Sequence, residues 1–364
     1  MTAGATRRSL LAGVAGLAGL PAQVMARDST AAGLAALAAR RGVDYGAAVE
    51  PENLARDSSF ADLINRECVS VTPENHLKWN ILRPTPDHFD FGGADAVVAF
   101  AKARQLAVHG HCLVWHEANP AWLAAGLTRQ NAEALLNHHI GKVVGRYAGH
   151  VGSWDVVNEP VERNDRRPDG LRRSLWLSSL GPDYIPLAFE AAHRADPAAR
   201  LVLSDYGLEY DDEPWMVEKR GSLLALLADW KRAGVPIHAL GIQGHLIGSR
   251  PPAFGTGLQN FLRDVGRLGL DIHVTELDVN DQQVAGGQDH RDRIVADCYR
   301  AFLRAVLTSS RLRVVTTWGL SDRYSSKQDM FPRPDGAPVR PLPFDRELSR
   351  KAAWHAMADA FSVR

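Results

Sequence analysis

The chain has 364 residues, of which 45% are hydrophobic, and its 42 basic residues balance its 42 acidic residues. This length fits one large α/β barrel, and the apolar content is sufficient for a large core. The charge balance argues against a nucleic acid or an anionic membrane surface as a partner.

The N-terminal segment has the features of a targeting signal rather than of a folded element. Arg7 and Arg8 precede a short apolar run, and Val24-Met25-Ala26 offers a small-x-Ala cleavage site. The run is too short to span a bilayer, so we predict a cleaved signal peptide over residues 1–26 and a catalytic barrel domain over residues 27–364. The paired arginines favour the twin-arginine route, with an ordinary Sec signal as the alternative. Either route predicts a secreted or periplasmic protein with no membrane-bound mature form.

The cysteines and histidines do not have the spacing of a metal site. Cys68, Cys112 and Cys298 lie far apart without a Cys-x-x-Cys pair, so we expect buried free thiols, although one disulfide is possible in an oxidising compartment. His111 and His116 do not form the His-Glu-x-x-His pattern of a zinc hydrolase. The sequence therefore predicts no metal.

Short apolar segments alternate with longer helical patterns along the rest of the chain, which is typical of βα units around a parallel sheet. Eight strands are predicted, over residues 44–49, 68–72, 107–114, 153–158, 200–204, 239–243, 271–276 and 313–318. The helical runs include residues 93–104, 129–147, 184–195, 213–233, 257–268 and 289–308, and a last helix is expected over residues 346–361. Eight such repeats predict a single (β/α)8 TIM barrel of the α/β class. An open doubly wound sheet is the alternative, but no Gly-x-Gly-x-x-Gly follows the first strand to support its dinucleotide-binding form.

Polar and aromatic side chains follow nearly every predicted strand, at the end where the active face of such a barrel lies. They are Glu74, Asn75, His76, Lys78 and Trp79 after the second strand, His111, Trp115, His116 and Trp122 in and after the third, Asn158 and Glu159 at the fourth, Tyr206 after the fifth, Gln243 and His245 at the sixth, Glu276 and Asp278 at the seventh, and Trp318 at the eighth. Taken singly, such a Trp is more often a core residue and such a Lys a solvated one. Together they suit a sugar, because aromatic faces stack on pyranose rings and short polar groups bond to hydroxyls.

Two of the predicted strands end in a glutamate. The run Trp154-Asp155-Val156-Val157-Asn158 leads into Glu159, and Ile272-His273-Val274-Thr275 leads into Glu276. The carboxyl ends of barrel strands share one face, so these two carboxyls can meet in one cleft. Paired carboxyls are the groups that hydrolyse glycosidic bonds.

From about Tyr45 to the C-terminus the chain resembles glycoside hydrolase family 10, the (β/α)8-barrel endo-β-1,4-xylanases. The motifs that carry the resemblance are Glu74-Asn75-His76-Leu77-Lys78-Trp79, His111-Cys112-Leu113-Val114-Trp115-His116, Trp154-Asp155-Val156-Val157-Asn158-Glu159-Pro160, Gly241-Ile242-Gln243-Gly244-His245-Leu246, Thr275-Glu276-Leu277-Asp278 and Trp318-Gly319-Leu320-Ser321-Asp322.

The resemblance implies a retaining enzyme that cleaves internal bonds of xylan and xylo-oligosaccharides, with Glu159 as acid/base and Glu276 as nucleophile. It implies that Asn158 bonds the sugar 2-OH and that His245, between Glu276 and Asp278, positions the nucleophile. The implied glycone-side contacts are Glu74, Asn75, Lys78, His116, Trp122 and Gln243, with Trp318 as the floor of the cleft and Tyr206 on the aglycone side. Neither a metal nor an organic cofactor is implied, and we expect a monomer.

Four positions depart from the family pattern. Asn is common at the positions of Ser204 and Gly207, Thr is usual at Cys112, and a Trp is usual at Ser326. The last departure concerns the choice of sugar. A related barrel hydrolase acting on β-glucan or aryl glycosides is therefore one alternative. A sugar-binding barrel without catalysis is the other, and the presence of both Glu159 and Glu276 counts against it.

Overall fold

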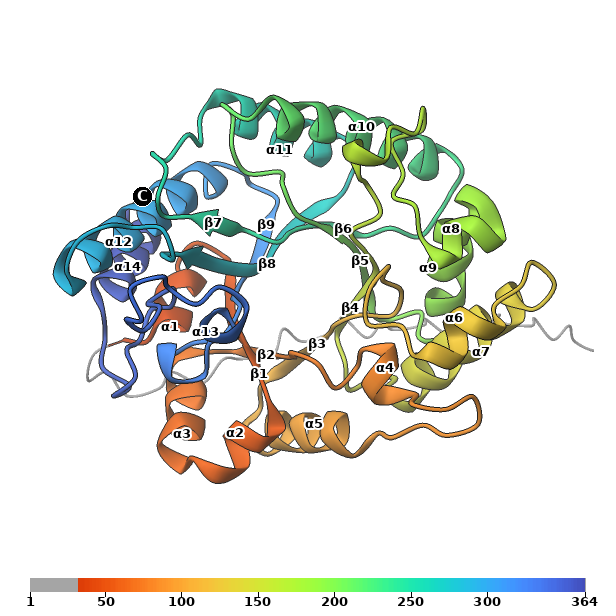
Figure 1. Ribbon diagram of the computed structural model, residues 1–364, viewed down its shortest axis with the longest axis horizontal. Coiled ribbons are helices and arrows are strands. Elements are labelled where there is room, and N and C mark those ends of the chain that lie inside the picture. Colours follow the sequence, from red (N-terminus) through yellow and green to blue (C-terminus); the bar gives the residue numbers. More distant parts are fainter. Residues whose placement is uncertain (1–31, 364) are drawn as a thin grey trace, which may run out of the picture. The chain divides into compact units, whose positions relative to one another are not determined.

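Eight parallel strands form a closed barrel in the computed structural model, which describes residues 32–363 (Figure 1). The barrel strands are β1 (Asp44–Val49), β2 (Ser70–Pro73), β3 (Ala107–Gly110), β4 (Ser153–Asn158), β5 (Arg200–Asp205), β6 (Ala239–Ile242), β8 (Asp271–Asn280) and β9 (Leu312–Thr317). They pair in sequence order, β6 pairs with β8, and β9 closes the ring against β1. The predicted (β/α)8 barrel is confirmed.

One long helix follows each strand of the barrel, and each helix except the last returns the chain to the next strand. These helices are α3 (Ser58–Glu67), α5 (Gly92–Arg104), α7 (Ala132–Arg146), α9 (Tyr184–Ala195), α10 (Pro214–Arg232), α11 (Thr256–Arg267), α12 (Gln288–Val306) and α14 (Ala352–Ser362). They form a ring outside the strands (Figure 1). In α11 the buried residues Leu258, Phe261, Leu262 and Val265 recur at helical spacing, so one apolar stripe of the helix faces the sheet.

Shorter elements lie before the first strand and in the loops. The short helices are α1 (Leu34–Ala39), α2 (Pro51–Arg56), α4 (Trp79–Leu82), α6 (Ala121–Gly126), α8 (Leu175–Leu180) and α13 (Lys327–Met330), and the 3-10 turns are η1 (Arg163–Asp165), η2 (Gly181–Asp183) and η3 (Asp322–Tyr324). The short strand β7 (His245–Ile247) pairs with the last residues of β8. Most of these elements belong to the loops that follow the strands, where the candidate site lies.

The predicted ends of two strands and the predicted start of the last helix are wrong. The seventh predicted strand was expected to end at Glu276, but β8 continues to Asn280 because β7 provides a second partner, with His245 opposite Asp278. The third was expected to reach Val114, but β3 ends at Gly110. A cis peptide joins His111 to Cys112, and beyond it the chain keeps only local contact with β4, through a bridge between Val114 and Val157.

The last helix begins at Ala352 rather than at Arg346. The reason is Asp345, whose Oδ1 accepts hydrogen bonds from the backbone N–H groups of Glu347, at 3.0 Å, and Ser349, at 2.8 Å. An Asp side chain that bonds to nearby backbone in this way competes with helix formation. The helical pattern of the segment is therefore interrupted by a local turn until Lys351.

The core is closely packed where β3 meets β4. A Cβ atom at Gly110 would lie 2.2 Å from Cε3 of the Trp154 indole, so only glycine permits this approach. On the outside of the barrel, the His139 ring stacks on Trp79 with 3.5 Å between centroids, which makes His139 a packing residue of α7. All three cysteines are buried and unpaired, as expected.

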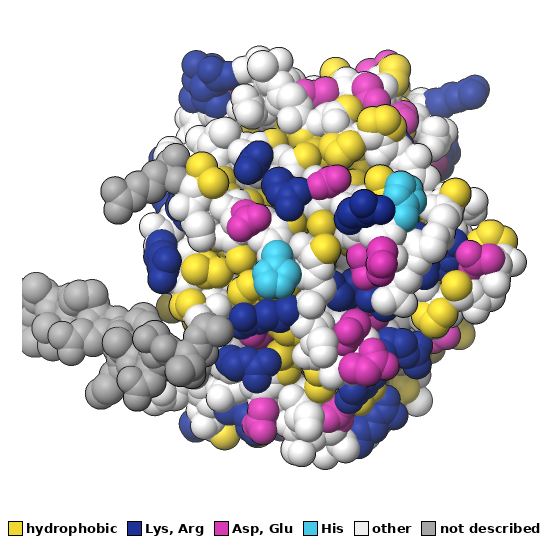
Figure 2. Space-filling view, turned by 90° about the vertical axis from the view of Figure 1, so that its left-hand side faces the viewer, with side chains coloured by type: hydrophobic (Ala, Val, Ile, Leu, Met, Phe, Trp, Pro, Cys, Tyr) yellow, Lys and Arg dark blue, Asp and Glu magenta, His cyan; other side chains and the backbone are white. Residues whose placement is uncertain are grey.

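The surface carries both signs of charge in a mixed arrangement. On the face in Figure 2, Lys and Arg side chains alternate with Asp and Glu side chains among uncharged ones. Within residues 32–363, no helix combines the length and the apolar character needed to cross a membrane.

Candidate active site

Glu159 follows directly on β4 at the carboxyl end of the barrel, and its backbone is held in an unusual conformation. Its φ angle is 56°, in the left-handed region that side chains other than glycine rarely adopt. Two hydrogen bonds hold it there: its N–H donates to the carbonyl oxygen of Ser204 at 2.8 Å, and its own carbonyl accepts from Arg172 Nε at 2.8 Å. The position of the carboxyl is therefore fixed by the neighbouring strand and by the loop after β4.

The Glu159 carboxyl accepts hydrogen bonds from side-chain amides on one side. Gln243 Nε2 donates to its Oε1 at 2.9 Å, and Asn158 Nδ2 lies 3.4 Å from the same atom. On the other side His116 Nδ1 lies 3.7 Å from Oε2. Burial and the nearby Arg172 guanidinium lower the pKa of His116, which favours its neutral ring. Glu159 thus has amide donors on one side of its carboxyl and the His116 ring on the other.

Glu276 lies within β8 in a charged network. His245 Nε2 is 3.2 Å from Glu276 Oε2, and His245 Nδ1 is 3.0 Å from Asp278 Oδ1. Burial alone would lower the pKa of His245, but the Asp278 and Glu276 carboxylates raise it to about 9. The imidazolium therefore donates to both carboxylates at neutral pH, which fixes the orientation of the Glu276 carboxyl.

Lys327 extends this network and was not among the predicted site residues. Its ammonium lies 3.1 Å from Asp278 Oδ2 and 3.4 Å from His245 Nδ1, and the residue is buried. The ion pairs with His245 and Lys327 lower the pKa of Asp278 against the opposing effect of its burial. Nothing in the sequence spacing indicates this contact, because Lys327 arrives from α13 in the long loop after β9.

Gln243 contacts both glutamates, one through its side chain and the other through its backbone. Its backbone carbonyl accepts the Glu276 N–H at 2.8 Å, and its side chain donates to Glu159 at 2.9 Å. Its amide also donates to Asn158 Oδ1 at 3.2 Å. Glu159 and Glu276 therefore share a neighbour, although Glu159 follows β4 and Glu276 lies in β8.

Inside the barrel, Asp155 supports the residues beneath this site. It is buried, and its Oδ2 is 2.9 Å from both His109 Nε2 and His111 Nδ1. Burial raises the pKa of Asp155, but the two histidines outweigh that effect and lower it. The His111 ring also lies 3.9 Å from Glu276 Oε1 and meets the Trp318 ring edge-on at 5.1 Å between centroids.

The predicted glycone-side residues after β2 lie together. Burial and the Glu50 carboxylate raise the pKa of Glu74 to about 7, although a hydrogen bond from Ser326 has the opposite effect and lowers it. The Lys78 ammonium donates to Asn75 Oδ1 at 2.8 Å and lies 5.9 Å from the centroid of Trp318. The Asn75 amide donates in turn to Glu50. Glu50 was missed by the sequence analysis, and it fixes the amide orientation of Asn75.

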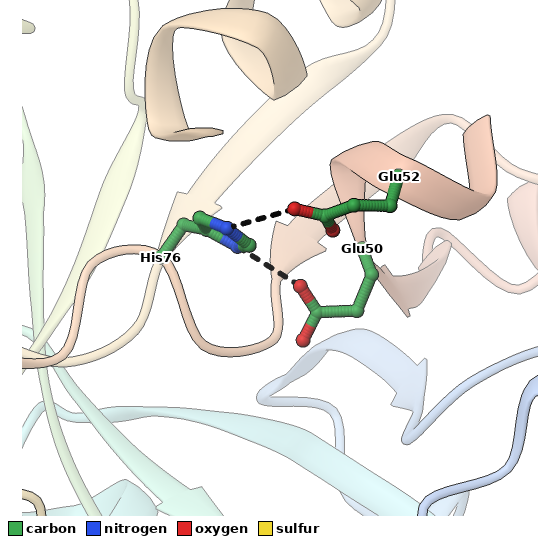
Figure 3. Close-up of side chains that lie close together, drawn as sticks. All are labelled: Glu50, Glu52 and His76. Atoms are coloured by element: carbon green, nitrogen blue, oxygen red, sulfur yellow. Dashed lines mark hydrogen bonds and ion pairs between the residues drawn. The ribbon is translucent and has the colours of Figure 1, made fainter. Parts of the chain in front are cut away.

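Glu50 also belongs to a cluster with the ligand types of a metal site. Figure 3 shows His76 between Glu50 and Glu52, with Nδ1 at 2.9 Å from Glu50 and Nε2 at 3.2 Å from Glu52. The hydrogen bond to Glu50 is the largest influence on His76, and it raises the pKa of that ring. Through Glu50 this cluster also holds the Asn75 amide.

Trp318, Tyr206 and Trp122 are three further predicted site residues. Trp318 is 8% exposed and lies against His111, where the floor of a cleft is expected. Tyr206 donates its hydroxyl hydrogen to Glu162 Oε2 at 2.8 Å and accepts from Arg172 Nη2 at 2.8 Å, which connects it to Glu159 through Arg172. Trp122 lies on α6, where its Nε1 donates to the Arg83 carbonyl at 3.0 Å.

A parallel barrel with two glutamates in different environments at the carboxyl ends of its strands defines a class of protein. Glycosidases use a pair of carboxyls whose environments differ, so that one can serve as acid and the other stays ionised. The aromatic and amide groups around the pair suit a carbohydrate.

Comparison with known proteins gives the family. Residues 33–360 match the sequence pattern of "Glycosyl hydrolase family 10". The chain is 36% identical over 318 residues to a "Beta-1,4-xylanase" of Dictyoglomus thermophilum, an alignment that covers 85% of this chain and 86% of the relative. It is 34% identical over 312 residues to an "Endo-1,4-beta-xylanase A" of Fusarium oxysporum, which covers 83% and 91% of the two chains.

A solved structure agrees with these relatives. The "xylanase 10B from Thermotoga petrophila RKU-1 in complex with xylobiose" superimposes with a TM-score of 0.82 at 28% identity, over 92% of this chain and 98% of that one. The chain belongs to glycosyl hydrolase family 10 and is a glycoside hydrolase.

Proposed function

We propose that the protein is a retaining endo-β-1,4-xylanase that hydrolyses internal bonds of xylan by double displacement. Glu159 is the acid/base and Glu276 the nucleophile. The observation that supports the proposal is that Gln243 contacts both glutamates, while the Glu159 carboxyl is bonded to amides and the Glu276 carboxyl to His245. The relatives named as xylanases support xylan as the substrate, and the xylobiose complex of the structural relative supports xylo-oligosaccharides as ligands.

The reaction follows from the partners of each carboxyl. In the first step Glu276 attacks the anomeric carbon while Glu159 gives its proton to the leaving oxygen, and the chain beyond the cleaved bond departs. In the second step Glu159 takes a proton from water, which displaces Glu276 and restores the original configuration. Asn158, held by Gln243, is placed to bond the sugar 2-OH, a contact that strengthens as positive charge develops on the ring.

The remaining predicted residues hold the sugar chain. Glu74, Asn75, Lys78, His116, Trp122 and Gln243 are assigned to the glycone side, Trp318 to the floor and Tyr206 to the aglycone side. Asp278 and Lys327 act through His245 on the nucleophile rather than on the sugar. The chemistry requires neither a metal nor an organic cofactor, and we expect a monomer.

Purified protein incubated with glucuronoxylan or with carboxymethyl cellulose tests the proposal. We expect a series of xylo-oligosaccharides from xylan, with a rapid loss of chain length that marks internal cleavage, and little product from the cellulose derivative. Faster hydrolysis of carboxymethyl cellulose would identify a glucanase instead. Binding of xylan without any new reducing ends would identify a barrel that binds sugar and does not cleave it.

The sequence departure at Ser326 gives a prediction about sugar choice. Ser326 is half-buried and donates a hydrogen bond to Glu74, where the family usually has a tryptophan. A serine leaves more room near C5 of the sugar, where glucose carries a hydroxymethyl group and xylose does not. We expect Ser326→Trp to raise the ratio of kcat/KM for an aryl xylobioside to that for the matching cellobioside, by roughly 10–200-fold, the range for one small group in a pocket.

The matched control is Ser326→Ala, which removes the hydrogen bond to Glu74 without adding bulk. It should leave the ratio between the two substrates near that of the wild type. An unchanged ratio in a folded, active Ser326→Trp variant would mean that another residue, such as Lys327, already closes that side.

We further propose that residues 1–26 form a cleaved signal peptide of the twin-arginine type, which would make the mature enzyme, residues 27–364, secreted or periplasmic. These first 26 residues lie outside the part of the chain that the structure describes. Changing both Arg7 and Arg8 to Lys should leave the precursor in the cytoplasm, because the export receptor reads these side chains. Fractionation of cells checks this, and normal export of the double variant would indicate a Sec signal. Xylanase activity in the lysate should persist, because the barrel begins after this segment.

A further inference from the structure

Gly207 and Trp215 form a contact at the rim of the barrel that the proposed mechanism does not use. Gly207 directly follows Tyr206 after β5, and its φ is 68°. A Cβ atom at this position would lie 2.4 Å from Cζ3 and 2.5 Å from Cη2 of Trp215. The indole therefore lies directly on the glycine backbone, and a larger residue at Gly207 would displace it. The asparagine that is common at this position in the family could not coexist with this ring position.

The chain connection places Trp215 on the same rim as the carboxyls. β5 ends at Asp205 and α10 begins at Pro214, so the first turn of α10 lies at the carboxyl end of the barrel. Lys219 is four residues after Trp215 and shares its helix face. The Lys219 ammonium lies 3.7 Å from the Tyr206 ring centroid and 2.7 Å from Asp205 Oδ1. The Trp215 face of α10 is thus turned toward Tyr206 and the end of β5.

This position is on the Glu159 side of the site. Tyr206 accepts a hydrogen bond from Arg172, and Arg172 donates to the carbonyl of Glu159. Glu159 protonates the oxygen that leaves with the aglycone, so the groups beyond it in this direction face the aglycone part of the sugar chain. Trp215 lies beyond Tyr206 along this path, next to Gly207.

The Trp215 indole is both restrained and accessible. It is 39% exposed, whereas Trp154, Trp176 and Trp79 are buried. Gly207 lies against the Cζ3 and Cη2 edge of the ring, and the residue as a whole remains partly exposed. A rigid, open aromatic face costs little conformational entropy on binding and suits the apolar face of a pyranose ring.

We propose that Trp215 is a stacking platform for a xylose unit on the aglycone side, one position or more beyond the sugar that meets Tyr206. The proposal rests on the proposed function, because it requires xylan to cross the site with its aglycone toward β5. The absence of a side chain at Gly207 makes room for this platform. Trp215 is a binding residue that favours long chains, and it does not touch the bond that is cleaved.

The test compares a long and a short substrate in Trp215→Ala. We expect kcat/KM for xylohexaose to fall roughly three- to tenfold, the size of one aromatic contact. The kcat/KM for an aryl xylobioside should remain unchanged, since its aryl group does not reach beyond the first aglycone position. The preferred cleavage site in xylohexaose should also move, because binding modes that extend over Trp215 lose their advantage.

Two further variants complete the experiment. Trp215→Phe keeps a ring and should restore most of the xylohexaose activity. Val217→Ala removes another exposed apolar side chain from the first turns of α10, 47% exposed, and should change neither substrate. Unchanged xylohexaose turnover in Trp215→Ala would overturn the proposal, as would equal losses on both substrates. If the wild type itself cleaves neither substrate, the proposed function fails instead.

Discussion

Replacing Glu276 by alanine is expected to abolish turnover of xylan and of an activated aryl xylobioside alike. The carboxylate is the group that attacks the anomeric carbon, and a good leaving group cannot substitute for it. Its environment supports this role, since His245 Nε2 lies 3.2 Å away and the pKa of His245 is raised to about 9. The loss should exceed the roughly 10²–10⁴-fold effect of removing a general acid. Rates of aryl release and of new reducing ends measure it.

The stereochemistry of rescue gives this prediction a sharper control. In Glu276→Ala, added azide can enter the vacated space and attack the anomeric carbon as the phenolate leaves, which gives an α-glycosyl azide. Glu276→Gln fills that space and should show no rescue. A β-configured azide from Glu276→Ala, or activity close to that of the wild type, would exclude Glu276 as the nucleophile.

The barrel could be predicted because the local sequence of each strand differs from the sequence on either side of it. The runs that form β1 to β6 and β9 are short, apolar and bounded by polar or turn residues. Their predicted boundaries differ from the observed ones by at most two residues, except at the end of β3. The end of β8 could not be predicted, because its last residues are in a strand only through pairing with β7. The start of α14 was missed because one side chain, Asp345, bonds to the backbone and interrupts a helical pattern.

The residues of the candidate site likewise divide into those that local sequence patterns predicted and those that they missed. Glu159 and Glu276 were found because they follow β-branched runs, and in the structure both contact Gln243. Lys327 and Arg172 were missed because they come from long loops, whose path no periodicity describes. Their contacts, 3.1 Å from Lys327 to Asp278 and 2.8 Å from Arg172 to the Glu159 carbonyl, depend on the tertiary fold.

Two further contacts that the family resemblance did not predict also come from loops and from the start of a helix. Glu50 orients Asn75 from the loop after β1, and Trp215 occupies the space above Gly207 from the first turn of α10. Only the second contact lies at a position that departs from the family pattern, because Asn75 belongs to a motif that matches it.

Replacing Glu159 by alanine is expected to have an effect that depends on the leaving group. In xylan the leaving group is a sugar hydroxyl oxygen, which needs a proton to depart. Hydrolysis of xylan should therefore fall by roughly 10²–10⁴-fold. An aryl xylobioside with an acidic phenol leaves without that proton, so its first step should be much less affected. The first step is read as the burst of phenol released before steady state, because the second step also loses its base.

Azide distinguishes the two carboxyls in this variant as well. In Glu159→Ala it should attack the glycosyl-enzyme, release Glu276 and give a β-glycosyl azide, the opposite anomer to that expected from Glu276→Ala. The neighbours of Glu159 make the substitution interpretable, because Gln243 and Asn158 can still bond to each other at 3.2 Å once the carboxyl is gone. If the variant lost the first step equally on xylan and on the aryl substrate, Glu159 would be acting on binding or on folding, and the acid would have to be sought elsewhere on the rim.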